Sequence, residues 1–355
     1  MESNQPECAV VLTHGLLVSP QAKTTHGMIR GPSRWPIACV VDPEHAGGEA
    51  GQLLDGKPAG IPVVATLKEA LGKGGGRITH CVIGIANAGG VLPEGLRKVL
   101  LEAADAGLVL VNGLHEPLAD DDELSRRCQA AGGRLLDIRA PRPVMELRFF
   151  TGEALALDIP RIAVLGTDCA LGKRTTCSAV TNELVRRGVK AEMIFTGQTG
   201  WMQGYPFGFI LDATPNDFVS GELEGELLRC AEEARPDVML IEGQSSLRNP
   251  TGPCGAELIV SAGASLVILQ HAPGRLFYKG LPTYPIPPLE DEIELIGRYG
   301  AKVIAVGLNL IGLGREKGEE LRRTYEESLG IPVALPLEEG AGRLADTVLS
   351  RSRKQ

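Results

Sequence analysis

Short runs of consecutive apolar residues alternate with segments of helical periodicity along almost the whole chain. In the first part, apolar runs of strand length lie at residues 9–13, 37–41, 61–64, 81–85, 108–111 and 134–138. Segments between them carry apolar residues three or four positions apart, as amphipathic helices do, at 67–71, 94–106 and 121–131. Strands that are apolar throughout are buried on both faces. The pattern therefore predicts an α/β fold with a parallel sheet covered by helices.

The same alternation starts again after a break at Arg139-Ala-Pro-Arg-Pro143, where two prolines interrupt the pattern. The later apolar runs lie at residues 162–165, 191–195, 238–241, 266–270, 303–307 and 333–335. The later helical segments lie at 173–187, 222–233, 289–298, 316–328 and 341–351. We therefore expect two domains, a Rossmann-like domain over residues 1–145 and a second parallel-sheet domain over residues 146–355.

Composition and charge indicate which classes of partner the protein binds and in which cellular compartment it works. The chain has 355 residues, 43% of them hydrophobic, and a net charge of −8, so a nucleic-acid-binding surface is not expected. The polar, acidic start resembles no export signal, and no apolar run approaches membrane-spanning length. The eight cysteines form no Cys-x-x-Cys pair, which indicates reduced thiols, a cytoplasmic location and no zinc site.

The segment Gly166-Thr-Asp-Cys-Ala-Leu-Gly-Lys-Arg-Thr-Thr176 has the layout of a phosphate-binding loop. It follows an apolar run and opens into a predicted helix. Glycines let the backbone close around an anion, the helix start supplies N–H groups, and a lysine adds a charge. We expect the second domain to be P-loop NTPase-like. Its predicted ligand-binding residues are Gly166, Thr167, Asp168, Gly172, Lys173, Arg174, Thr175 and Thr176.

This loop departs from the common pattern at two points. Five residues separate Gly166 from Gly172, where the pattern has four. Arg174 stands where Ser or Thr normally follows the lysine and holds Mg²⁺. Phosphate binding is therefore the firmer prediction, and binding of Mg²⁺-ATP the weaker one.

Other polar groups follow the apolar runs of the second half. Glu242 ends the run at 238–241, where phosphate-loop proteins carry a carboxylate that faces the phosphates. His271 follows the next run and can act as a general base, or it can bind backbone. The predicted catalytic residues are Glu242, His271 and Lys173. The predicted substrate-binding residues are Gln198, Thr199, Gln244, Ser245 and Arg275.

The first half has only a partial dinucleotide-binding pattern. Asp42 ends a strand-like run, where an acidic residue can grip a ribose hydroxyl, or it can simply cap the turn at Pro43. The first turn reads Thr13-His-Gly-Leu-Leu17 and lacks the G-x-G-x-x-G fingerprint. NAD binding is therefore not expected.

Four motifs together carry a family resemblance: the loop at 166–176, Thr196-Gly-Gln-Thr-Gly200, Glu242-Gly-Gln-Ser-Ser-Leu247 and His271-Ala-Pro-Gly-Arg275. They resemble the DUF1611 family, and the loop and the Glu-Gly segment also resemble dethiobiotin synthetases. The first resemblance spans nearly the whole chain. It implies a D-glutamate N-acetyltransferase that acts in D-glutamate breakdown with acetyl-CoA as donor substrate.

Two other functions remain open from the residues. An ATP- and Mg²⁺-dependent kinase or ligase, like dethiobiotin synthetase, would activate a carboxylate and release ADP. A nucleotide-sensing regulatory protein would bind nucleotide without turnover. In each case the expected ligands are small molecules, and phosphate-loop domains often associate, so we expect a homo-oligomer.

Overall fold

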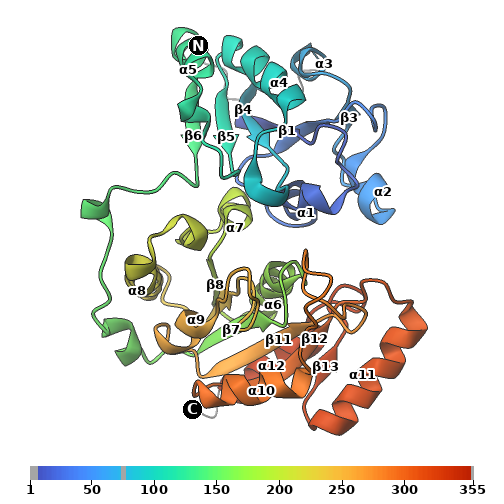
Figure 1. Cartoon of the computed structure of the whole chain (residues 1–355), viewed down its shortest axis with the longest axis vertical. Coiled ribbons are helices and arrows are strands. Elements are labelled where there is room, and N and C mark those ends of the chain that lie inside the picture. The colour runs from blue at the N-terminus through green and yellow to red at the C-terminus, as the bar shows by residue number, and fades with distance from the viewer. Residues whose placement is uncertain (1–6, 73–76, 353–355) are drawn as a thin grey trace. The chain divides into compact units, whose positions relative to one another are not determined.

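The computed structural model describes residues 7–72 and 77–352; the acidic start at 1–6 lies outside this range. Contacts divide the chain into two compact units (Figure 1). The first comprises Met1–Pro141 with Gln198–Gly204, and the second comprises Arg142–Gly197 with Tyr205–Gln355. None of the helices in the described part of the chain is both long and apolar enough to cross a membrane.

The first unit contains a six-stranded sheet in the order β3-β2-β1-β4-β5-β6, with every pair parallel. Its strands are β1 (Glu7–Leu12), β2 (Ile37–Val41), β3 (Val63–Val64), β4 (Arg77–Ile83), β5 (Val109–Asn112) and β6 (Arg134–Asp137). Its helices are α1 (Lys23–Arg30), α2 (Ala50–Asp55), α3 (Leu67–Gly72), α4 (Glu94–Asp105), α5 (Asp122–Ala130) and α7 (Gln198–Met202). Helix α4 packs against α3 and α5, while α1 packs against α2 and α7.

Asp42, which follows β2, has a structural task in this unit. Its buried carboxylate accepts hydrogen bonds from Thr13 Oγ1 (2.6 Å) and from the Leu17 backbone N–H (3.0 Å). His45 binds the other carboxylate oxygen. Burial alone would raise the pKa of Asp42, but these hydrogen bonds hold the pKa below its ordinary value. Asp42 therefore fastens the turn after β1 to the end of β2.

The second unit contains a seven-stranded parallel sheet in the order β13-β12-β11-β7-β10-β8-β9. Its strands are β7 (Arg161–Gly166), β8 (Ala191–Phe195), β9 (Phe207–Gly208), β10 (Val238–Glu242), β11 (Leu266–His271), β12 (Lys302–Leu308) and β13 (Val333–Ala334). Its helices are α6 (Lys173–Arg186), α8 (Asn216–Glu233), α9 (Ala256–Val260), α10 (Leu289–Arg298), α11 (Arg315–Leu329) and α12 (Gly342–Ser352). Because β7 lies between β10 and β11, the loops that follow these three strands meet at one edge of the sheet.

The predicted fold class is confirmed, since both units are parallel α/β sheets. Several short elements are absent from the prediction: α1, α2, α7, α9 and β9. Helix α1 reads Lys-Thr-Thr-His-Gly-Met-Ile-Arg, and its threonines and glycine hide the helical pattern. Strand β4 begins four residues before the predicted run at 81–85, because its first residues are polar.

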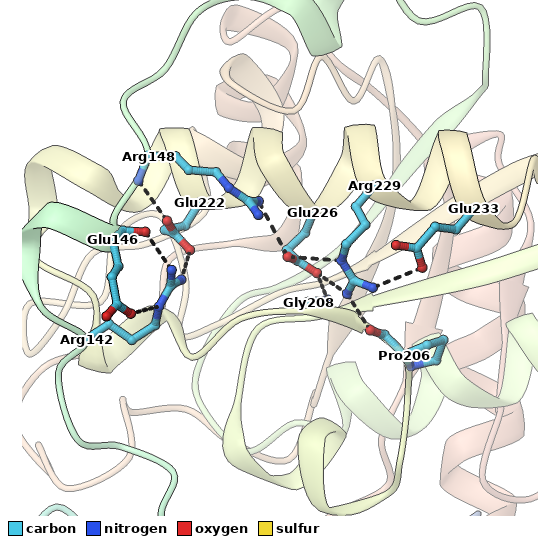
Figure 2. Close-up of polar contacts among 9 residues, drawn as sticks. All are labelled: Arg142, Glu146, Arg148, Pro206, Gly208, Glu222, Glu226, Arg229 and Glu233. Carbon is cyan, nitrogen blue, oxygen red and sulfur yellow. Dashed lines mark hydrogen bonds and ion pairs between the residues drawn. The ribbon is translucent and has the colours of Figure 1, made fainter.

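Buried glutamates on α8 hold the chain segment that opens the second unit (Figure 2). Glu222 accepts hydrogen bonds from Arg142 Nη1 (2.5 Å) and from the Arg148 backbone N–H (2.9 Å). One turn further, Glu226 pairs with Arg229 and accepts a hydrogen bond from the Gly208 N–H of β9 (2.9 Å). These carboxylates therefore attach the segment around 142–148, and the edge strand β9, to one helix.

Replacing Glu222 by alanine should lower the free energy of unfolding by about 2 kcal/mol, since the Arg148 N–H and Arg142 lose a charged acceptor. Urea denaturation measures this change. Glu233→Ala is a matched control on the same helix, because the Glu233 side chain is largely exposed and its ion pair with Arg229 lies at the surface. Equal effects of the two substitutions would contradict the anchoring role of Glu222.

Candidate active site

The loop from Gly166 to Gly172 joins the central strand β7 to helix α6. Gly172 has a φ of 96°, a left-handed conformation that glycine adopts without strain, and α6 starts at the next residue. Asn309, which follows β12, donates from Nδ2 to the Leu171 carbonyl (3.0 Å) and so holds the end of the loop in place. The arrangement is that of a strand, a glycine-bounded loop and a helix start, the layout of anion-binding loops.

Lys173, the first residue of α6, is buried with only 6% of its surface exposed. Its ammonium donates to the Asp168 carbonyl across the loop (2.6 Å). Burial lowers the pKa of Lys173 to about 8, against the opposing effect of nearby acidic groups that include Asp168 and Glu242. A side chain on Gly243 would lie 3.1 Å from Lys173 Cδ and 2.2 Å from the Val164 carbonyl oxygen, so the glycine after Glu242 leaves room for the lysine.

The Asp168 side chain organises the other side of the loop and is fully buried. It accepts hydrogen bonds from Asn249 Nδ2 (2.9 Å), Arg275 Nη1 (3.0 Å) and the Lys279 backbone N–H (2.9 Å). Arg275 also donates to the Cys169 carbonyl (2.6 Å). The sequence assigns Asp168 to the phosphate-carrying ligand and Arg275 to the substrate, but in the structure the two side chains bind each other. Arg275 therefore stabilises the loop. Its role in binding a substrate stays a prediction.

Glu242 ends β10, the strand next to β7, and its position in the sheet is opposite Val164. Only 5% of the residue is exposed. The Thr196 N–H donates to Glu242 Oε2 (3.0 Å), and Gln244 Nε2 donates to the Thr196 hydroxyl (3.1 Å). The carboxylate therefore lies at the same edge of the sheet as the loop, close enough to Lys173 for their charges to interact.

His271 ends β11 on the opposite side of β7 and is also buried. Its Nδ1 shares a hydrogen bond with the Thr167 hydroxyl (2.9 Å), and its ring meets that of Tyr325 edge to face. Burial lowers the pKa of His271 to about 4, so the imidazole is neutral near pH 7 but too weak a base to be well matched to that pH. The geometry favours a role in holding Thr167, and Glu242 becomes the stronger candidate for the base.

This lowered pKa predicts a pH-dependent stability. The unfolded chain binds a proton at His271 near pH 6.5 while the folded protein resists protonation until about pH 4, so stability is lost as the pH falls through this window. The loss amounts to about 3 kcal/mol. Chemical denaturation of the protein and of His271→Gln at pH 7 and pH 4 measures it. We expect a smaller decrease in the variant, and equal decreases would contradict the prediction.

The remaining predicted residues of the second unit lie at the loop or beside it. Thr176 donates from its hydroxyl to Gln270 Oε1 (2.9 Å), while Arg174 and Thr175 are half-buried in the first turn of α6. Ser245 has a φ of 39°, which is uncommon for a residue with a side chain, and its hydroxyl accepts a hydrogen bond from the Cys169 thiol (3.4 Å). Strained backbone of this kind is often kept at functional sites.

Gln198 and Thr199 belong to helix α7, which is part of the first unit. Gln198 Oε1 accepts from Arg139 Nη2 (2.8 Å), and the Thr199 and Thr24 hydroxyls are hydrogen-bonded (3.2 Å). The sequence suggests a glycine-rich strand end for this segment, but the structure forms a short helix. Their role in binding substrate stays a prediction.

Sequence reasoning missed Asn249 and Gln270, both of which are completely buried. Asn249 contacts Asp168, and Gln270 contacts Thr176 of the loop helix. The sequence could have indicated Gln270. A polar amide at the end of an apolar strand is buried, and a buried amide needs a hydrogen-bond partner, here among the residues at the carboxyl edge of the sheet. Among the described residues, no cluster of three or more His, Cys, Asp and Glu could hold a metal ion.

Both units of the chain are similar to known proteins. The family model described as the DUF1611_C P-loop domain matches residues 148–345, and the one described as the DUF1611_N Rossmann-like domain matches residues 43–141. A crystal structure of a DUF1611 family protein from Anabaena variabilis is 30% identical and covers 98% of this chain, and this chain covers all of that protein, with a TM-score of 0.87.

Two curated relatives have a named activity. A D-glutamate N-acetyltransferase from Tritonibacter scottomollicae is 33% identical over 316 residues, which is 86% of this chain and 90% of that protein. A D-glutamate N-acetyltransferase from a Pseudoalteromonas species is 30% identical over 266 residues, which is 73% of this chain and 78% of that protein. These relatives support an N-acetyltransferase enzyme.

Proposed function

The chain belongs to the DUF1611 family, and we propose that it transfers an acetyl group from acetyl-CoA to the amino group of D-glutamate. The relatives support the reaction and the acceptor. The observation in the structure that supports the donor is the phosphate loop with the buried Lys173 at the start of α6. Coenzyme A carries phosphate groups, which such a loop can hold without hydrolysing them.

The residue after the lysine favours a donor that needs no metal. In P-loop NTPases a Ser or Thr at this position holds Mg²⁺, whereas this chain has Arg174 there. An arginine adds a second cation beside Lys173 and offers N–H groups that pair with phosphate oxygens. The loop therefore supplies its positive charge from side chains.

Acetyl transfer needs a free amine, and then a group that stabilises negative charge on the thioester oxygen. In the proposed reaction Glu242 takes a proton from the substrate ammonium. The amine nitrogen then attacks the thioester carbonyl, a carbon–nitrogen bond forms and the carbon–sulfur bond breaks. The thiolate of coenzyme A leaves with the electron pair and takes up the second proton that the nitrogen loses as the amide forms, while Glu242 returns the first proton to solvent. Backbone N–H groups of the loop are suited to stabilising the intermediate oxyanion.

Two arginines of the second unit are candidates for the substrate carboxylates, and both already have acidic partners, two of them in the case of Arg248. Arg275 pairs with Asp168 (3.0 Å), and Arg248 donates from Nε to Glu292 (2.7 Å). A guanidinium has five N–H donors, so each arginine can bind a substrate carboxylate through its remaining groups. Selection of an acidic amino acid is the expected consequence.

The direct test incubates the purified protein with acetyl-CoA and D-glutamate in the presence of EDTA, and identifies the product by mass spectrometry. L-glutamate and D-alanine report on stereochemistry and on the need for a side-chain carboxylate. A parallel sample with ATP and Mg²⁺ tests a kinase or ligase, which the loop and the position of Glu242 would also suit. ADP release without N-acetylglutamate would reject the acetyltransferase and support that second function.

A further inference from the structure

The first unit contains a pocket of about 570 Å³ whose role the acetyl transfer leaves unexplained. It lies at the carboxyl edge of the sheet, where Leu12 ends β1, Val41 ends β2 and Ala65 directly follows β3; Val99 of α4 forms another part of its wall. Open parallel sheets bind their ligands at this edge. The volume falls within the range of pockets that hold small molecules.

The charged groups around this pocket favour an anion. Lys68 of α3 and Lys98 of α4 are exposed at its rim, together with one carboxylate, Glu102. Within residues 7–72 and 77–352, neither lysine has an ion-pair or hydrogen-bond partner. Arg97, which directly precedes Lys98 on α4, is by contrast paired with Asp121 and Glu123. Two unpaired ammonium groups at the mouth of a mostly apolar pocket suit a ligand with an apolar body and a negative end.

His14 brings an aromatic ring to the pocket wall, and Pro43 adds an apolar surface. His14 has a φ of 52°, which is unusual for a residue with a side chain. Its imidazole lies directly against α4 because Gly95 has no side chain: a Cβ there would be 2.4 Å from His14 Cε1. The backbone conformation of His14 and the missing side chain of Gly95 together place the imidazole at the wall, and an aromatic ring packs well against a flat heterocycle.

The details do not fit a dinucleotide. The turn after β1 lacks the glycine fingerprint that binds a pyrophosphate. We propose that this pocket binds a purine mononucleotide, with its base against the apolar wall and its phosphate at Lys68 and Lys98. This is a second ligand site, contained wholly within the first unit and independent of the proposed acetyl transfer.

Isothermal titration with AMP tests the proposal, because AMP lacks the β-phosphate that a phosphate loop cradles. We expect AMP to bind the whole protein, and the double substitution Lys68→Glu/Lys98→Glu to weaken this binding by about tenfold or more. The matched control, Lys57→Glu/Lys302→Glu, reverses two exposed charges outside the pocket and should change AMP affinity by less than about twofold. Adenosine should bind at least about tenfold more weakly than AMP.

Four results would overturn the proposal. These are the absence of AMP binding, equal affinities of the pocket variant and its control, equal affinities of AMP and adenosine, and loss of AMP binding in Lys173→Met. The last would place AMP at the phosphate loop. Acetyl transfer by Lys68→Glu/Lys98→Glu, measured without AMP, shows whether the proposed reaction holds, whatever the outcome for this pocket.

Discussion

Replacing Lys173 by methionine is expected to lower kcat/KM for acetyl-CoA by about 10²-fold or more. Methionine is similar in length and fits the buried position at the start of α6. It removes the charge and the hydrogen bond to the Asp168 carbonyl. In the proposed complex this charge faces the phosphates of coenzyme A at short distance and in a buried setting. Steady-state kinetics with acetyl-CoA as the varied substrate measures the loss. Direct titration with CoA shows whether it lies in binding.

Lys190→Met is the matched control, because Lys190 is exposed and lies outside the loop. The pKa of about 8 adds a second readout: Lys173 is charged below that pH and neutral above it, so the KM for acetyl-CoA should increase as the pH rises beyond 8. The pH-dependent increase should vanish in Lys173→Met. An unchanged KM in this variant would show that the loop serves another ligand.

Local patterns in the sequence predict the secondary structure around this site and the position of its central loop. Alternation of apolar runs and amphipathic segments predicts both parallel sheets, and the carboxyl ends of parallel strands share one edge. From this alone, the loop after β7 and Glu242 at the end of β10 are expected at the same edge, and both lie there. The glycines and Lys173 predict the loop because their chemistry is local to eleven residues.

The supports of the loop are not local, so the sequence cannot specify them. Asp168 binds Asn249, Arg275 and Lys279, which follow it by 81, 107 and 111 positions. Many polar residues lie at such separations, and only the folded chain selects these partners. The same holds for His271: an ordinary imidazole titrates near neutral pH, but burial beside Thr167 and Tyr325 removes that property.

Helix α7 is another feature that the sequence pattern does not predict. Its sequence, Gln-Thr-Gly-Trp-Met, has neither the length nor the periodicity of a helix and is more typical of a glycine-containing turn. Contacts with the first unit stabilise it: Gln203 donates to the Gly27 carbonyl (2.8 Å), and Arg34 stacks on Trp201. An element that is stabilised mainly by tertiary contacts has no clear local sequence pattern. The sequence therefore does not predict that Gln198 and Thr199 belong to a helix of the first unit.

Glu242→Gln should lower kcat by about 10³-fold with little change in the KM for acetyl-CoA. Glutamine keeps an oxygen that can accept the hydrogen bond from the Thr196 N–H, so the strand end retains its geometry while the proton acceptor is lost. The limb of the pH–rate profile that reports the base should disappear as well. His271→Gln provides the comparison: since His271 supports Thr167, its replacement should cost less than about tenfold. If His271→Gln abolishes transfer while Glu242→Gln remains active, the base is His271, and Glu242 serves only to hold Thr196 in place.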